Sequence, residues 1–254
     1  DRGVLGVSCD WVFNSSARPR RYPRALKSRL LLGPRFAPLR ADFSRRPRHP
    51  FKIGPIKNAL VTLGGGDSAQ ALRRSLPTIL AALPEADVAV ISVNRMFFDT
   101  PAYRKALFAF AAAGKGIVML HPGTWYAFPN WPELNAKLVG GGSRGHDKLG
   151  PYSVNVLKAE HPIMRGVPAK FEVIDELYYV NAEPEKIPAG TSAIEVLAAS
   201  SPSIKFGQPH PVAWITRHDT AKVVGFTLGH DERTHDHPAF KTLLVNAVKW
   251  VGGK

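Results

Sequence analysis

The chain has 254 residues, of which 44% are hydrophobic, and it carries a formal net charge of +14 with a single cysteine. This length suffices for one large domain with a full core, while one cysteine excludes a disulfide framework and any metal site built from several thiolates. Every apolar run is far shorter than the roughly 20 residues that cross a bilayer, and no apolar signal-peptide core is present. We therefore expect a cytoplasmic protein that does not associate with membranes.

The positive charge is concentrated at the beginning of the chain. Residues 1–58 hold 14 basic and three acidic residues, a net charge of +11, whereas the rest of the chain carries only +3. Arginine and proline are frequent in this segment and apolar residues are few, so we predict a disordered basic leader over 1–57. The same composition fits an organelle presequence or an extension outside the mature protein. Nucleic-acid binding is the less favoured alternative, because few aromatic residues are available to stack on bases.

Apolar runs alternate with helical segments between residues 58 and 120. Each apolar run is short and ends at a turn, as a buried parallel strand does. The first helical segment has one apolar face, although Pro77 is expected to kink or break it. The predicted order is strand 59–63, helix about 68–83, strand 87–93, helix about 101–113 and strand 116–120. This order predicts an α/β fold, a three-layer sandwich with a mostly parallel central sheet of the flavodoxin-like type.

The second half of the chain is less regular. A glycine-rich loop at 140–147 follows a short helix, and a polar turn at 217–220 joins two strands into a predicted hairpin. The expected elements are the helix 131–138, the strands 152–157, 172–180, 211–216 and 222–228, and a last helix from Pro238 to residue 251. The sequence shows neither an internal repeat nor a second hydrophobic core. We therefore predict one domain over residues 58–254.

Two histidines directly follow predicted parallel strands. His121 comes after the strand 116–120 and His230 follows the strand 222–228, and eight of the nine histidines lie between residues 121 and 237. Ligands bind at the carboxyl ends of strands in open parallel sheets, so we expect these two imidazoles to meet at that edge of the sheet. Histidine can act near neutral pH as a base, an acid or a metal ligand.

The other histidines are weaker candidates. His146 lies in the glycine-rich loop, where the backbone can approach a ligand closely, and is a candidate substrate or metal contact. We expect His161, His235 and His237 to order nearby backbone, and His210 and His218 to be solvated in loops.

Asp175 and Glu176 are adjacent carboxylates in a predicted strand. Neighbouring strand residues point to opposite faces, so we expect at most one of the two to face a given site.

Two common enzyme classes lack their motifs. The triglycine at 64–66 does not continue as G-x-G-x-x-G, so no nucleotide cofactor is expected. The candidate nucleophile elbow at 120–124 has no serine or cysteine at its apex, and Cys9 lies in the leader.

The chain from about residue 87 to 252 resembles the trehalose-utilisation (ThuA-like) family, which has the fold of class I glutamine amidotransferases. The motifs that carry the resemblance are the run 116–121, the glycine-rich loop ending at His146, His161-Pro162-Ile163 with Arg165-Gly166, the run 175–178, the run 210–214 and the run 228–231. The family has more sequence, including another strand, before the strand near residue 87. Residues 59–83 therefore resemble a shortened or altered first unit.

The resemblance implies that the chain is not a glutaminase. Glutaminases of this fold carry a cysteine at the elbow apex and a His-x-Glu pair after a later strand. In this sequence His121 occupies the apex, while His230, Asp231 and Glu232 keep the His-x-Glu spacing. A thioester route is unavailable without the thiolate.

The resemblance instead implies carbohydrate metabolism, with 3-keto disaccharides or glycosides as the favoured substrate. The proton next to the carbonyl of such a sugar is acidic, so imidazoles could drive elimination, hydrolysis or isomerisation. We assign His121 and His230 as the acid–base pair, with Glu176 or Glu232 as the carboxylate that orients them.

Further substrate contacts are assigned around this pair. Trp125 and Tyr126 follow the elbow and, with Trp131, could stack on a sugar ring. The substrate-binding set is completed by His146, Asp175, Tyr178 and Asp231.

Two other functions remain open at this point. One is a sugar-binding module without catalysis, and the other is a hydrolase that depends on a divalent metal held by His121, His146 and His230. The expected partner is a small sugar, and the sequence leaves open whether the chain forms a homo-oligomer.

Overall fold

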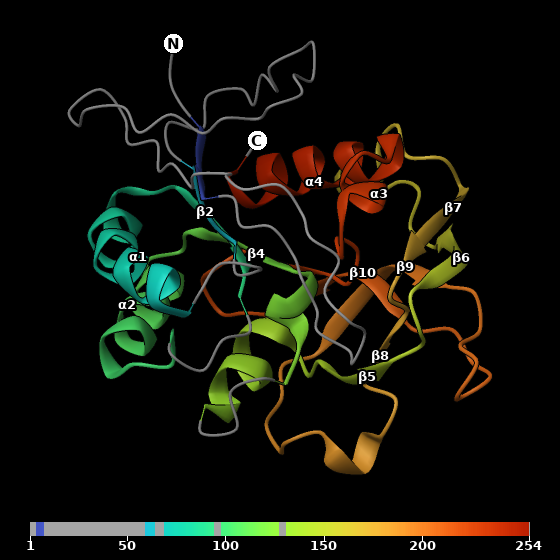
Figure 1. Cartoon of the computed structure of the whole chain (residues 1–254), viewed down its shortest axis with the longest axis horizontal. Coiled ribbons are helices and arrows are strands. Elements are labelled where there is room, and N and C mark those ends of the chain that lie inside the picture. Colours follow the sequence, from blue (N-terminus) through green and yellow to red (C-terminus); the bar gives the residue numbers. More distant parts are fainter. Residues whose placement is uncertain (1–3, 8–58, 64–68, 94–97, 127–130, 254) are drawn as a thin grey trace, which may run out of the picture.

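The computed structural model describes residues 4–7, 59–63, 69–93, 98–126 and 131–253, with side chains from residue 76 onward. Its main feature is a nine-stranded sheet in the order β1-β2-β3-β4-β11-β10-β9-β6-β7 (Figure 1). The strands are β1 (Val4–Val7), β2 (Ala59–Leu63), β3 (Val88–Ser92), β4 (Gly116–Leu120), β11 (Val223–Phe226), β10 (Pro211–Thr216), β9 (Ile194–Ser200), β6 (Gly150–Val156) and β7 (Lys170–Asp175).

The sheet has a parallel half and an antiparallel half. The strands β1, β2, β3, β4 and β11 pair in parallel, and each pair from β11 to β7 is antiparallel. Seven of these nine described strands therefore point the same way, and only β10 and β6 are reversed. The predicted α/β fold with a mostly parallel central sheet is confirmed, as is the β10–β11 hairpin.

Helices cover both faces of the parallel half. Alternate residues of β3 and β4 belong to two separate hydrophobic clusters, because successive strand side chains point to opposite faces. Ala89 and Ile117 pack with α1 (Ala69–Ala82) and α2 (Pro101–Ala112), while Val118 packs with α4 (Pro238–Val251). In Figure 1 the strands β2 and β4 run between α1 and α4. The three layers are thus helix, sheet and helix.

The first helix continues through its proline. α1 is a single helix that contains Pro77, and a 3-10 turn at Leu83–Glu85 follows it. The expected break at Pro77 does not occur. None of the described helices is both long and apolar enough to span a membrane.

The edge of the sheet next to β2 is formed by residues from the start of the chain. Val4–Val7, inside the range predicted to be a disordered leader, form β1 and pair in parallel with β2. The turn expected after the strand 59–63, with the triglycine 64–66, lies outside the described residues, as do all residues of the 1–57 range except those of β1.

The strand predicted over 172–180 is in fact two strands in two sheets. β7 ends at Asp175 in the main sheet, and β8 (Tyr178–Val180) pairs with β5 (Ser143–His146) in a separate two-stranded sheet. β5 occupies the end of the predicted glycine-rich loop. Glu176 consequently lies in the irregular segment between the two sheets. Its side chain therefore need not point to the opposite face from Asp175, as it would within a strand.

Candidate active site

His121 stands at the apex of a tight turn after β4. The strand leads directly into the 3-10 turn η3 (His121–Thr124), and His121 has a positive φ of 44°. Residues other than glycine rarely adopt this conformation, and such strain is concentrated at functional sites. The turn is closed by a hydrogen bond that the Thr124 hydroxyl donates to the His121 carbonyl at 2.7 Å. The predicted elbow is therefore present, with an imidazole at its apex.

The two ring nitrogens of His121 have different partners. Nδ1 lies 2.6 Å from the carbonyl oxygen of Thr227, just after β11, and must donate its proton to that oxygen. In the neutral ring Nε2 then carries the lone pair. Nε2 lies 3.2 Å from the Tyr178 hydroxyl and 3.5 Å from Oε2 of Glu176. The Thr227 carbonyl thus turns the basic nitrogen of His121 towards Glu176.

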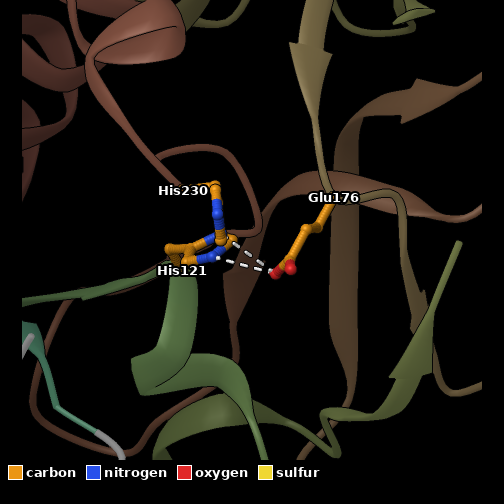
Figure 2. Close-up of side chains that lie close together, drawn as sticks. All are labelled: His121, Glu176 and His230. Atoms are coloured by element: carbon orange, nitrogen blue, oxygen red, sulfur yellow. Dashed lines mark ion pairs between the residues drawn. The ribbon is translucent and has the colours of Figure 1, made fainter. Parts of the chain in front are cut away.

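Glu176 lies at the centre of three imidazoles. Its Oε2 is 3.5 Å from His121 Nε2 and 3.2 Å from His230 Nδ1, and its Oε1 is 3.7 Å from His146 Nδ1 (Figure 2 shows the first two). Burial alone would raise the pKa of this carboxyl, but hydrogen bonds from His230 and from His121, whose Nε2 can donate only when the ring is protonated, together with the charges of the nearby imidazoles hold the pKa at about 2. Glu176 is therefore a carboxylate at every physiological pH.

His230 meets His121 across this carboxylate. The ring centroids of the two histidines are 5.5 Å apart. Burial lowers the pKa of His230, but the hydrogen bond and the charge of Glu176 outweigh it, and the pKa is raised above its ordinary value. One nitrogen of each ring and one Glu176 oxygen all lie within 4.8 Å of one another. The two imidazoles meet as expected from the ends of their strands.

Asp175 fixes the loop that carries His230. This side chain is fully buried and accepts hydrogen bonds from the backbone N–H groups of Gly229, at 2.8 Å, and His230, at 3.2 Å. Asp175 and Glu176 therefore do separate things: the first fixes the loop that carries His230, and the second contacts the imidazoles. Asp175 was assigned as a substrate contact, and the structure instead places it beneath the site.

The exposed fraction of the side chain increases from His121, at the buried end of the site, to His146. The side chain of His121 is 0% exposed, that of Glu176 9%, that of His230 12% and that of His146 33%. The Nδ1 of His146 donates to the carbonyl oxygen of Asp147 at 2.8 Å, so that in the neutral ring Nε2 carries the lone pair. His146 is the most accessible imidazole at this site.

Aromatic rings line the side of His146. Trp125 packs edge-on against His146, with centroids 5.6 Å apart, and against Tyr178 at 5.2 Å. Tyr126 lies instead under the guanidinium of Arg144, 3.8 Å from its ring, beside a different small hollow. Trp131 is buried in the core against Tyr103 and Phe108, so it cannot stack on a ligand.

Of the two carboxylates assigned to orient the histidines, the structure brings only Glu176 to them. Glu232 is exposed as the first residue of the short helix α3 (Glu232–His235), and Asp231 is the N-cap of that helix and pairs with Arg233. The His-x-Glu spacing is present in the sequence, but the helix start directs Glu232 to the surface. Asp231 therefore acts locally as a cap, where we had expected a substrate contact.

The remaining histidines mostly order the backbone, as expected. Nδ1 of His161 accepts from Ile163 N–H, and that of His237 from Ala239 N–H. His218, which we expected to be solvated, is partly buried, and its Nδ1 accepts from Thr220 N–H. His235 donates to the carbonyl of Gly229 at 2.9 Å. His210, which we expected to be solvated, is buried and bonds the Ser203 hydroxyl at 3.0 Å.

The hydrogen-bond partner of His121 Nδ1 could not be predicted from the sequence. The Thr227 carbonyl sets the tautomer of His121, yet a backbone oxygen leaves no signal in a sequence. Only the register of β11 beside β4 places it there.

A comparison with protein families matches most of the described chain. The family model of ThuA, described as trehalose utilisation, matches residues 70–251. The chain belongs to the ThuA family. Membership implies a carbohydrate-related role for this ThuA protein. No curated protein matches the chain.

Two solved structures of ThuA-like proteins share the fold of this ThuA protein, and a third structure is a weaker match. A ThuA-like protein from Parabacteroides merdae is 18% identical with a TM-score of 0.58, covering 79% of this chain and 91% of that chain. A ThuA-like protein from Bacteroides uniformis is 22% identical with a TM-score of 0.58, covering 82% and 95%. A glutamine amidotransferase from Thermotoga maritima is 10% identical with a TM-score of 0.40, covering 68% and 80%.

Proposed function

We propose that this ThuA protein is an enzyme that acts on oxidised sugars, with 3-keto disaccharides or glycosides as its substrates. The observation that carries the proposal is the arrangement of three imidazoles around the carboxylate of Glu176, at distances of 3.2 to 3.7 Å. The family description supports a sugar as the substrate. A module that only binds sugar has no need of a buried carboxylate that gathers imidazoles of graded exposure.

The substrate class suits acid–base chemistry by imidazole. A ketone at C3 makes the proton on C2 acidic, and the glycosidic oxygen on C1 is then positioned to leave. Removal of the C2 proton gives an enolate, which expels the glycosidic oxygen. Addition of water to the product completes a hydrolysis, whereas reprotonation of the enolate gives an isomer. All three outcomes begin with one proton transfer, for which a group with a pKa near neutrality is best suited.

His146 is the group that we propose removes this proton. It is the most exposed of the three imidazoles, and its Nδ1 is committed to the Asp147 carbonyl, which leaves Nε2 as the base. The proton moves from carbon to Nε2 and the electron pair of the C–H bond moves into the enolate. The imidazolium of His146 can then return the proton to the departing glycosidic oxygen. Trp125, packed against the His146 ring, offers a face for the sugar.

His121, Glu176 and His230 form the end of the site that receives the carbonyl oxygen. The facing nitrogens of the two histidines are turned to Glu176 and buried, so direct contact of both with a carbon-bound proton is sterically disfavoured. We had assigned these two histidines as the acid–base pair. Their burial favours a division in which they hold the oxygen end while His146 transfers the proton.

The experiment is a turnover assay with a matched pair of sugars. A disaccharide oxidised at C3 and its unoxidised parent are incubated with the purified full chain, and products are followed by NMR. We expect turnover of the keto sugar alone. His146→Asn should reduce the rate by about 10²- to 10⁴-fold, the usual contribution of general acid–base catalysis. His218→Ala, at the opposite end of β11, should leave the rate unchanged.

Two results would overturn the proposal. Binding of the keto sugar without any turnover would show a sugar-binding module. Full activity of both His146→Asn and Glu176→Gln would place the reaction elsewhere in the molecule.

A further inference from the structure

We infer that His121, Glu176 and His230 form a binding site for one divalent transition-metal ion of the Zn²⁺ class. The ligand atoms are Nε2 of His121, Oε2 of Glu176 and Nδ1 of His230. The site itself is argued from the geometry alone. Only the role of the ion in the reaction rests on the proposed function.

The separations of these atoms suit a common ion. Zn²⁺ holds imidazole nitrogen and carboxylate oxygen at about 2.0 to 2.2 Å, so two of its ligands at a tetrahedral angle are about 3.4 Å apart. Oε2 of Glu176 lies 3.5 Å from His121 Nε2 and 3.2 Å from His230 Nδ1. All three atoms lie within 4.8 Å of one another. Two imidazoles and one carboxylate are also the protein ligands of many catalytic zinc sites, which keep a further position open.

The ligands are oriented by contacts outside the cluster. His121 donates its Nδ1 proton to the Thr227 carbonyl, which directs the Nε2 lone pair inward, as is usual for a metal-bound histidine. The Asp175 carboxylate holds the backbone N–H of His230 and so fixes the position from which its ring extends. The Tyr178 hydroxyl lies 3.2 Å from His121 Nε2 and would have to release the lone pair of that nitrogen when the ion binds. Support of this kind accompanies metal sites because it raises affinity.

The charges around the cluster also favour a cation. Asp175 and Glu176 are consecutive buried acids, and Asp175 is satisfied by backbone N–H groups. Among the described residues, the three ion pairs of Glu176 all go to imidazoles and none to lysine or arginine. A buried carboxylate is costly unless a positive charge compensates it. With Glu176 as its one anionic ligand, a divalent ion would leave the set of ion and ligands with a net positive charge, which would stabilise a developing enolate oxygen.

The exposed side of the cluster indicates what the ion would bind. His146 and Trp125 lie on that side, and three protein ligands leave at least one position for an outside oxygen. A 3-keto sugar offers a carbonyl oxygen beside a hydroxyl. An α-hydroxy ketone is therefore the chemical class that this site would recognise.

Metal binding is tested without reference to activity. The full chain is stripped with a chelator, and Co²⁺ alone is titrated while its visible absorption is followed; calorimetry with Zn²⁺ gives the stoichiometry. We expect one ion per chain. Glu176→Gln, which keeps the shape of the side chain, should weaken binding by more than about 100-fold, because losing a direct ligand exceeds the 10- to 100-fold cost of losing an outer partner.

Two further variants are controls for misfolding and for metal binding by histidines outside the site. His121→Asn should also weaken binding, and asparagine tolerates the positive φ of this position, so the fold is expected to persist by circular dichroism. His218→Ala removes a histidine at the opposite end of β11 and should bind Co²⁺ like the wild type.

The outcomes separate this inference from the proposed function. Failure of the wild type to bind either ion, or equal binding by Glu176→Gln and the wild type, would overturn the metal site. If the stripped protein still turns over the keto sugar at its full rate and binds no ion, the function stands and the inference falls. If the ion binds at the cluster but no oxidised sugar reacts, the inference stands and the function falls.

Discussion

The Asp175 carboxylate accepts a hydrogen bond from the backbone N–H of His230 at 3.2 Å, and thereby links the end of β7 to the loop after β11. These residues are far apart in the chain, and β7, which ends at Asp175, and β11, which precedes His230, are not neighbours in the sheet order. The same carboxylate also accepts from Gly229 at 2.8 Å. The position of the His230 ring relative to Glu176 therefore depends on a residue that does not contact the ring.

Asp175→Asn should loosen this link. One oxygen becomes an NH₂ group that faces backbone N–H donors, so at least one buried hydrogen bond is lost at a cost of about 1–3 kcal/mol. Urea unfolding should show this loss, and turnover should fall with it. Asp236→Asn, at an exposed ion pair with Lys241, is the control and should change stability by less than about 1 kcal/mol. Equal stability of Asp175→Asn and the wild type would show that the loop after β11 keeps its conformation without the Asp175 carboxylate.

Gly123 should tolerate no side chain. A Cβ at this position would collide with the backbone carbonyl oxygen of Ile91, the neighbouring strand end. Gly123→Ala must therefore displace the turn that carries His121, and we expect a destabilisation of about 1–3 kcal/mol together with reduced turnover. Gly150→Ala, where the new Cβ meets only an ordinary contact at 3.5 Å, should be nearly neutral. Unfolding curves that coincide for the two variants would contradict this account of the elbow.

His210 should make the protein less stable in acid. Burial lowers the pKa of this ring below its ordinary 6.5, and the backbone hydrogen bond to Val180 only partly opposes this effect. The unfolded chain therefore binds the proton more readily, so the contribution of His210 is complete above pH 6.5 and is lost as the pH falls below it.

His210→Asn tests this contribution. It keeps a polar group beside Ser203 but removes the titrating ring. Its free energy of unfolding, measured in urea between about pH 7.5 and 5, should fall less steeply than that of the wild type, by at most about 1.4 kcal/mol per pH unit for one proton. Parallel pH profiles would show that His210 does not carry the effect.

The parallel half of the fold could be predicted from the sequence because each strand there is a short apolar run. The runs at β2, β3 and β4 alternate with two helices, and that order leaves few arrangements. The positions of His121 and His230 followed from the same rule, since His121 comes directly after β4 and His230 lies in the loop after its parallel neighbour β11.

The carboxylate could not be chosen from the sequence. The His-x-Glu spacing indicated Glu232 and the run 175–178 indicated Glu176, so both remained candidates. The cap that Asp231 forms on α3 directs Glu232 to the surface. Glu176 reaches the imidazoles because the chain leaves the main sheet after Asp175 and joins β5 through β8. The burial of His210 likewise depends on contacts with Tyr179 and Val180 of β8, which lie far from it in the chain and which no local sequence pattern indicates.

The central claim is that His146 removes a proton beside the carbonyl of an oxidised sugar, with the His121–Glu176–His230 cluster at the oxygen end. The most direct measurement uses a 3-keto disaccharide that carries deuterium at both carbons flanking the carbonyl, with mass spectrometry of the product. We predict that the wild type releases deuterium into water in step with turnover, and that His146→Asn does so far more slowly. A product formed at the wild-type rate with both deuterium atoms retained would contradict it.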